Sequence, residues 1–229
     1  WKYENPYKPF RKYITYPNGR GEKLFRKYRV KIQFSDRILG GVPKAKELIQ
    51  GWLRARGVKA EDVKELAEKV EEEVEAVPKE ELEMAAWTGF KRDDEGLYIE
   101  ERQVKACLRE AASTLALTKI RGFRDAVNHG VFTQPDKIHL KRKGQLIKEP
   151  DGYEEGPIHV MGPRGPRTAL KRQDYIEEAE AEFTLLVAGS TIAEKDLQQM
   201  MELGQYIGLG ASRSQGYGKF TLVEFKPVQ

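Results

Sequence analysis

The residues of this chain with the clearest chemical potential lie near its C-terminus, in the stretch GLGASRSQGYGKF at 208–220. Arg213, flanked by Ser212 and Ser214, supplies a guanidinium fork, two hydroxyls and nearby backbone N–H groups, a combination that suits a phosphate. Lys219 adds a further positive charge. The stretch also holds four glycines, Gly208, Gly210, Gly216 and Gly218. Because glycines in such number indicate unusual backbone angles or a close approach of the backbone to something else, the stretch predicts a phosphate-binding loop. The alternative is a glycine-rich turn with a solvated arginine.

Two further basic regions are suited to a nucleic-acid backbone. The first is in GPRGPRTALKR at 162–172, where four side chains can follow a second length of phosphates. These are Arg164, Arg167, Lys171 and Arg172. The second region is the N-terminus: residues 1–31 hold ten Lys/Arg against two Glu, interleaved with aromatic residues whose rings can stack on bases. We predict a basic aromatic arm over 1–24; the alternative is a solvated arm whose aromatic residues dock on its own core.

Two nucleotide-binding motifs are excluded at the glycine-rich stretch. A dinucleotide-binding G-x-G-x-x-G that starts at Gly208 requires a glycine where Arg213 stands, and the stretch leads into a strand rather than a helix. A P-loop fails because Gly218-Lys219 is followed by Phe220, and Arg213 occupies the place of its first glycine.

Metal, cofactor and nucleophile chemistry find no support in the sequence. One cysteine and three scattered histidines form no spaced ligand set, so we predict no metal and no cofactor. The pair Asp93-Asp94 precedes Glu95-Gly96 and predicts a turn rather than a magnesium site. His129, in an NHG stretch, is the best candidate for a general acid or base in cutting RNA through its 2′-hydroxyl; the alternative is a surface histidine.

Composition indicates the class of protein that carries these sites. The 229 residues are 39% hydrophobic, which suits one domain with a real core. No apolar run approaches the roughly 18 residues of a membrane span, so no membrane partner is expected. The single cysteine, Cys107, fits a reducing cytoplasm.

Hydrophobic periodicity predicts the elements that position the sites. We expect strands at 28–34, 181–188 and 217–225, and helices at 43–56, 60–77, 100–117 and 192–203. Thr191 and Glu194 form the signature of a capping box at the start of the last helix, and Gly204 can close it. Residues 121–180 carry strand-like segments without a clear assignment.

This order predicts an α+β fold with a ferredoxin-like (RRM-like) β-α-β-β-α-β core. We expect a single domain over 25–229, with a helical insertion at about 43–83 after the first strand and a long irregular excursion at about 121–180. In this topology the first and third strands are central neighbours. Both helices cover one face of the sheet and leave the other free for a partner or RNA.

Three segments resemble one protein family. GLGASRSQGYGKF is similar to the glycine-rich loop, of the form G-h-G-x5-G-h-G, that the RAMP superfamily of CRISPR-associated RNA-binding proteins carries before the last strand of its ferredoxin-like fold. DDEGLYIEERQVKACLREAAS at 93–113 resembles a segment of the Cas-seven-like backbone subunits of the type III kind, with Lys105 and Arg109 matching its lysine and arginine. VKIQFSDRILGG at 30–41 resembles their first strand and Gly-Gly.

The resemblance also has departures. Where the family has Pro-Gly-Ser-Ser, this chain has Glu100-Glu101-Arg102-Gln103. Type III backbone subunits that cut target RNA carry an aspartate a few residues upstream of this segment. The stretch MAAWTGFK has no acid between Met84 and Lys91, which implies a subunit that binds RNA without cutting it.

The sequence therefore supports three hypotheses. The first is a non-catalytic subunit that holds single-stranded guide (CRISPR) RNA in a multi-subunit effector complex, beside copies of itself and other subunits. The second is a Cas-six-like endoribonuclease that processes CRISPR precursor RNA with His129. The third is a protein-interaction module whose glycine-rich loop packs on a partner protein.

Overall fold

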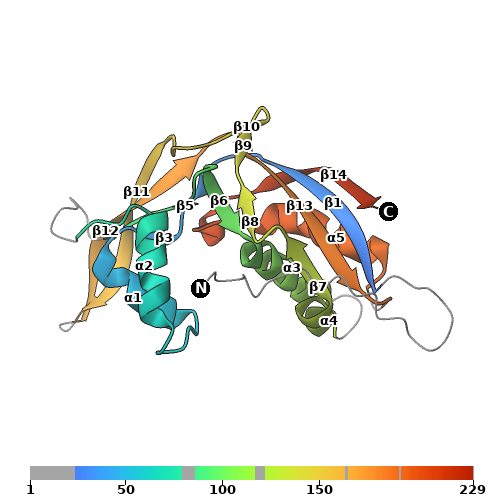
Figure 1. Cartoon of the computed structure of the whole chain (residues 1–229), viewed down its shortest axis with the longest axis horizontal. Helices are drawn as coiled ribbons and strands as arrows, with labels where there is room; N and C mark the ends of the chain where they lie inside the picture. The colour runs from blue at the N-terminus through green and yellow to red at the C-terminus, as the bar shows by residue number, and fades with distance from the viewer. Residues whose placement is uncertain (1–23, 79–85, 117–121, 163–164, 191, 229) are drawn as a thin grey trace, which may run out of the picture.

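The chain is built around one antiparallel sheet with helices on one side. The computed structural model describes residues 24–78, 86–116, 122–162, 165–190 and 192–228. Figure 1 shows this sheet at one end of the long axis, and the hairpin β11–β12 with the helices α1 and α2 at the other end. Among the described residues, no helix is both long and apolar enough to span a membrane.

The central strand of the main sheet is β1 (Phe25–Phe34), which pairs antiparallel with β13 (Glu180–Ala188) on one side and β14 (Phe220–Val228) on the other. The short β7 (Val131–Gln134) pairs antiparallel with β13, close to β9 (Lys141–Arg142). The order β14-β1-β13-β7 is that of a ferredoxin-like core, so the predicted α+β class and its central neighbours are confirmed.

The alternation of β1 decides which face of the sheet is buried. Tyr28, Val30, Ile32 and Phe34 are all buried, whereas the residues between them are exposed or half-buried. The buried side chains join one core with α3 (Glu101–Ala116) and α5 (Glu194–Ile207). Both helices therefore cover the same face. A third helix, α4 (Phe123–Gly130), packs beside α3.

A second, smaller core lies under two helices. Their buried side chains gather around Val42. The helices are α1 (Lys46–Ala55) and α2 (Val63–Glu73). Beside them is a second sheet, in the order β11-β12-β4-β3, with β2 also pairing with β12. Its strands are β2 (Ile38–Leu39), β3 (Val42–Pro43), β4 (Trp87–Gly89), β11 (Gly152–Gly162) and β12 (Gly165–Ile176).

A third, small sheet links the two cores. It consists of β5 (Lys91–Arg92), β6 (Leu97–Glu100) and β8 (Lys137–His139). Another short strand, β10 (Gln145–Leu146), pairs with β9. The turn predicted at Asp93–Gly96 is confirmed, because the Asp93 N–H donates to the Gly96 carbonyl over 3.1 Å.

The structure corrects the predicted end of the last helix. Gly204 does not close α5, which continues to Ile207 and is followed by Gly208. Gly204 is buried inside the helix, and a Cβ there would lie 3.2 Å from the Cys107 Sγ on α3. A glycine at this position thus permits close packing of α3 on α5. The residue before α5 is Ala193, which makes no side-chain cap; Thr191 of the predicted capping box lies outside the described residues.

Candidate nucleic-acid interface

The glycine-rich loop is closed at its base by contacts between its own two ends. The Leu209 N–H donates to the Gly218 carbonyl over 2.9 Å, and the Gly218 N–H donates to the Arg37 carbonyl over 2.9 Å. A Cβ on Gly218 would lie 1.8 Å from the Leu209 carbonyl oxygen, and one on Gly208 would lie 2.9 Å from backbone atoms of Gly218. These two glycines therefore let the two ends of the loop cross.

The first half of the loop is docked on the second sheet. The Ala211 N–H donates to the Leu39 carbonyl over 2.9 Å, and a Cβ on Gly210 would lie 2.8 Å from that same oxygen. Ser212 has a left-handed backbone (φ 53°), and its hydroxyl bonds to the Gln173 amide oxygen of β12 over 2.7 Å. We predicted that the Ser212 hydroxyl binds a phosphate. In the structure it instead holds the loop against β12.

The tip of the loop is open. It is a single 3₁₀ turn, η2 (Arg213–Gln215), followed by Gly216, which has φ 97° and no atom within 4 Å of a Cβ built on it. Ser214 is exposed at the tip and Lys219 beyond it. Of the four glycines, Gly216 alone combines a left-handed backbone with open space in front of it, so another molecule can approach the backbone there.

Arg213 is held beside the tip by one partner. Its Nη1 lies 2.9 Å from the Glu110 Oε2 of α3, and the two side chains are 32% and 54% exposed. An ion pair with this exposure contributes at most about 1 kcal/mol. The guanidinium can therefore exchange the carboxylate for a phosphate at little cost.

Of the second basic group, the structure places Lys171 on the strand face that holds the loop. Lys171 and Gln173 lie two residues apart on β12 and share that face. Burial lowers the pKa of the Lys171 amine. Arg172 points to the opposite face, where its Nε donates to Glu155 over 2.9 Å. Arg167 belongs to β12 further from the loop, opposite Val160, and Arg164 lies outside the described residues.

Lys105 and Arg109 form a different surface from the loop. They lie roughly 140° and 100° around α3 from Glu110, the partner of Arg213. The Lys105 Nζ is 4.9 Å from the ring centroid of Phe132, which is 40% exposed on the edge strand β7. The Arg109 Nε is buried without an acceptor among the described residues. The structure therefore places these two cations apart from Arg213.

Sequence analysis did not identify Arg37, the residue whose carbonyl supports the base of the loop. Arg37, between β1 and β2, donates from Nη1 to Glu154 over 2.7 Å and from Nε to Glu177 over 2.8 Å. Its guanidinium also lies 4.3 Å from the ring centroid of Tyr175. These contacts fix the carbonyl that receives the Gly218 N–H. Only the tertiary structure brings these partners together.

The open face of the main sheet carries balanced charge at its centre. The Arg29 Nε lies 3.6 Å from Glu182, and the Lys31 Nζ lies 2.8 Å from Glu180, both across the β1–β13 pair. Cations that are already paired with neighbouring carboxylates offer little net charge to RNA. The loop is therefore a better candidate contact than the centre of this face.

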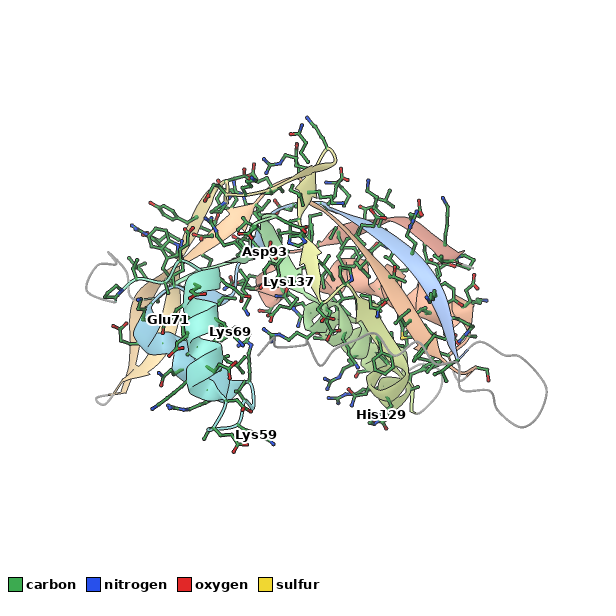
Figure 2. All side chains as sticks on the ribbon, viewed as in Figure 1. Lys59, Lys69, Glu71, Asp93, His129 and Lys137 are labelled. Carbon is green, nitrogen blue, oxygen red and sulfur yellow. The ribbon has the colours of Figure 1, made fainter. Side chains whose placement is uncertain are left out.

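Among the described residues, the His129 side chain has no partner that could make it a catalytic group. It is exposed in the last turn of α4 and makes no hydrogen bond or ion pair with the described residues. Figure 2 shows it at the end of that helix, away from Asp93 and Lys137. The described residues also contain no group of three or more side chains that could hold a metal ion.

His139 contacts a carboxylate. Its Nε2 lies 2.8 Å from Asp93 Oδ1, and Lys137 donates to the other oxygen of Asp93 over 3.0 Å. The N–H groups of Glu95 and Gly96 also donate to Asp93. Both oxygens of Asp93 are thus occupied in joining the β5–β6 turn to β8, and we assign this group a structural role.

The predicted arm over 1–24 lies outside the described residues except for Leu24.

No family model matches the chain, and no curated protein matches it. Among solved structures, it is similar to a chain of a type III-B Cmr-beta bound to cognate target RNA, with a TM-score of 0.51 and 15% sequence identity. The match covers 90% of this chain and 61% of that one, so the chain spans less than two thirds of the length of the protein it resembles. At this identity the likeness is one of fold.

Proposed function

We propose that this chain is an RNA-binding subunit of a type III CRISPR effector complex, and that it holds guide RNA without cutting it. The observation that carries the proposal is the glycine-rich loop, which is fixed at its base and open at its tip. Gly216 leaves room for a phosphate to approach the backbone, Arg213 supplies positive charge at the tip, and the exposed Lys219 supplies a second charge just after the base of the loop. The similar chain belongs to a complex bound to target RNA, which supports the same class of ligand.

The loop is suited to sequence-tolerant recognition. It offers the charges of Arg213 and Lys219 and the exposed Ser214 hydroxyl to phosphates and 2′-hydroxyls, and none of these distinguishes one base from another. A subunit that holds guides of differing sequence requires this property. Under the proposal, the partners are single-stranded guide RNA, further copies of this chain and other effector subunits in the cytoplasm.

Substitution of Arg213 tests the proposal. We expect Arg213→Ala to weaken binding to two single-stranded RNAs of unrelated sequence by similar factors, measured by fluorescence anisotropy. The slope of log K against log salt should become shallower by about 0.7, the value for one phosphate contact in a single strand. Arg29→Ala, which removes the same charge from the open face of the sheet, is the matched control. A loss confined to one of the two RNAs would contradict backbone recognition.

A further inference from the structure

Two arginines meet on one tryptophan at the junction of α1 and α3. The guanidinium carbon of Arg56, just after α1, lies 4.0 Å from the ring centroid of Trp52, and that of Arg102, in the first turn of α3, lies 5.7 Å from it. Trp52 itself packs on the small core under α1 and α2. A ring fixed in this way restrains the arginines beside it.

The positive charge at this junction is only partly neutralised. Arg102 donates from Nε to Glu100 over 3.0 Å, and the same carboxylate lies 3.5 Å from the Lys91 Nζ. Arg56 forms no ion pair with any carboxylate in the described part of the chain. Partial burial lowers the pKa of Arg56 and the nearby charge of Arg102 lowers it further, which outweighs the opposing effect of the Glu100 carboxylate. The protein thus holds two like charges close together, an arrangement that a bound anion stabilises.

The geometry favours a phosphate over a base as the ligand. Arg56 already covers the indole ring at stacking distance, and it is an exposed residue, so its N–H groups can bind a phosphate through two parallel hydrogen bonds. The helix α3 carries one residue of the junction and one residue that contacts the glycine-rich loop. On α3, Arg102 and Glu110 (the partner of Arg213) are separated by roughly 12 Å along the axis and about 80° around it.

We propose that Arg56 and Arg102, held against Trp52, bind a backbone phosphate of the same single-stranded RNA that contacts the glycine-rich loop. This inference rests on the proposed RNA binding and adds a second contact to it. It gives the α1–α2 insertion a function, because Trp52 and Arg56 come from the insertion and Arg102 comes from the core helix α3.

The test compares two substitutions that remove the same charge from the same region. Arg56→Ala removes the cation on the ring, whereas Arg54→Ala removes an exposed arginine whose contact is Gln50, at 3.5 Å. Affinity for a single-stranded RNA is measured by anisotropy between 50 and 200 mM salt. We expect Arg56→Ala to reduce the slope of log K against log salt by about 0.7. The ratio of the affinity of the unaltered protein to that of Arg56→Ala should therefore fall about 2.6-fold between 50 and 200 mM salt. Arg54→Ala should leave the slope unchanged.

The outcomes separate this inference from the proposed function. If Arg56→Ala behaves like Arg54→Ala while Arg213→Ala weakens binding, the junction site is overturned and the loop stands. If the unaltered protein binds no RNA, both are overturned. Tryptophan emission gives a second measurement: RNA should change the emission of the unaltered protein, and Trp52→Phe should remove most of that change. An equal change in Trp52→Phe would contradict contact at the junction.

Discussion

The crossing of the two loop ends at Gly218 can be tested by placing one methyl group at two neighbouring positions. Gly216 and Gly218 both have a left-handed backbone, with φ values of 97° and 74°. Alanine at either position therefore costs about 1–2 kcal/mol in backbone strain. At Gly216 no further cost is expected, because nothing lies within 4 Å of the new Cβ.

At Gly218 the same methyl group meets the protein itself. Its Cβ would lie 1.8 Å from the Leu209 carbonyl oxygen, a backbone atom that cannot rotate away. The crossing must open, which removes the 2.9 Å hydrogen bond from Leu209 to Gly218 at a cost of about 1 kcal/mol. Leu209 is only 2% exposed, and partial loss of its burial adds about 1–2 kcal/mol. The total for Gly218→Ala is about 3–5 kcal/mol.

Urea denaturation of the two variants in parallel measures the difference. We expect the free energy of unfolding to fall by about 2–3 kcal/mol more for Gly218→Ala than for Gly216→Ala, with the same dependence on urea. Equal destabilisation of the two variants would refute the crossing, because the backbone strain alone is similar at both positions.

Three further predictions concern single side chains. Glu110→Gln removes the carboxylate that competes for Arg213, so RNA affinity in the anisotropy assay should rise, by up to about five-fold for an ion pair of about 1 kcal/mol; a fall in affinity would contradict the competition. Asp93 has its pKa lowered to about 2, because hydrogen bonds from His139 and Lys137 outweigh the opposing effect of burial. Its ionised form therefore stabilises the fold above about pH 4, and this stabilisation is lost as the pH falls through 2. Asp93→Asn should lower the free energy of unfolding by about 2 kcal/mol at pH 7 and about half as much at pH 3, and a loss independent of pH would exclude the ion pairs as its cause. Burial raises the pKa of Cys107 to about 12, so a thiol reagent should label it only after unfolding; rapid labelling of the native protein would contradict its burial.

The elements of the main core could be predicted because their patterns are strong and local. The alternation in β1 and the helical periodicity of α3 identified both elements to within a few residues. The predicted end of α5 was wrong because Gly204 has the sequence signature of a helix stop. In the structure Gly204 lies inside the helix and allows close contact with Cys107. The hairpin β11–β12 was not assigned because Gly156-Pro157 interrupts β11 and Gly165-Pro166 begins β12.

The candidate site could be predicted only in part. Composition and spacing identified the loop, and its glycines do adopt left-handed backbones. The sequence could not distinguish Gly218, which the protein's own backbone approaches, from Gly216, which faces open space. Glu110 and Arg37 act on the loop across long sequence separations, so no local pattern indicates either of them.

The nucleic-acid content of the protein purified at low salt tests the central claim most directly. The absorbance ratio, followed by digestion with ribonuclease or deoxyribonuclease, distinguishes bound RNA from DNA and from clean protein. We predict RNA of regular length on an assembly of several copies, and less RNA on Arg213→Ala, which lacks one phosphate contact. A clean monomer with no affinity for single-stranded RNA would contradict the account and leave the glycine-rich loop as a structural turn.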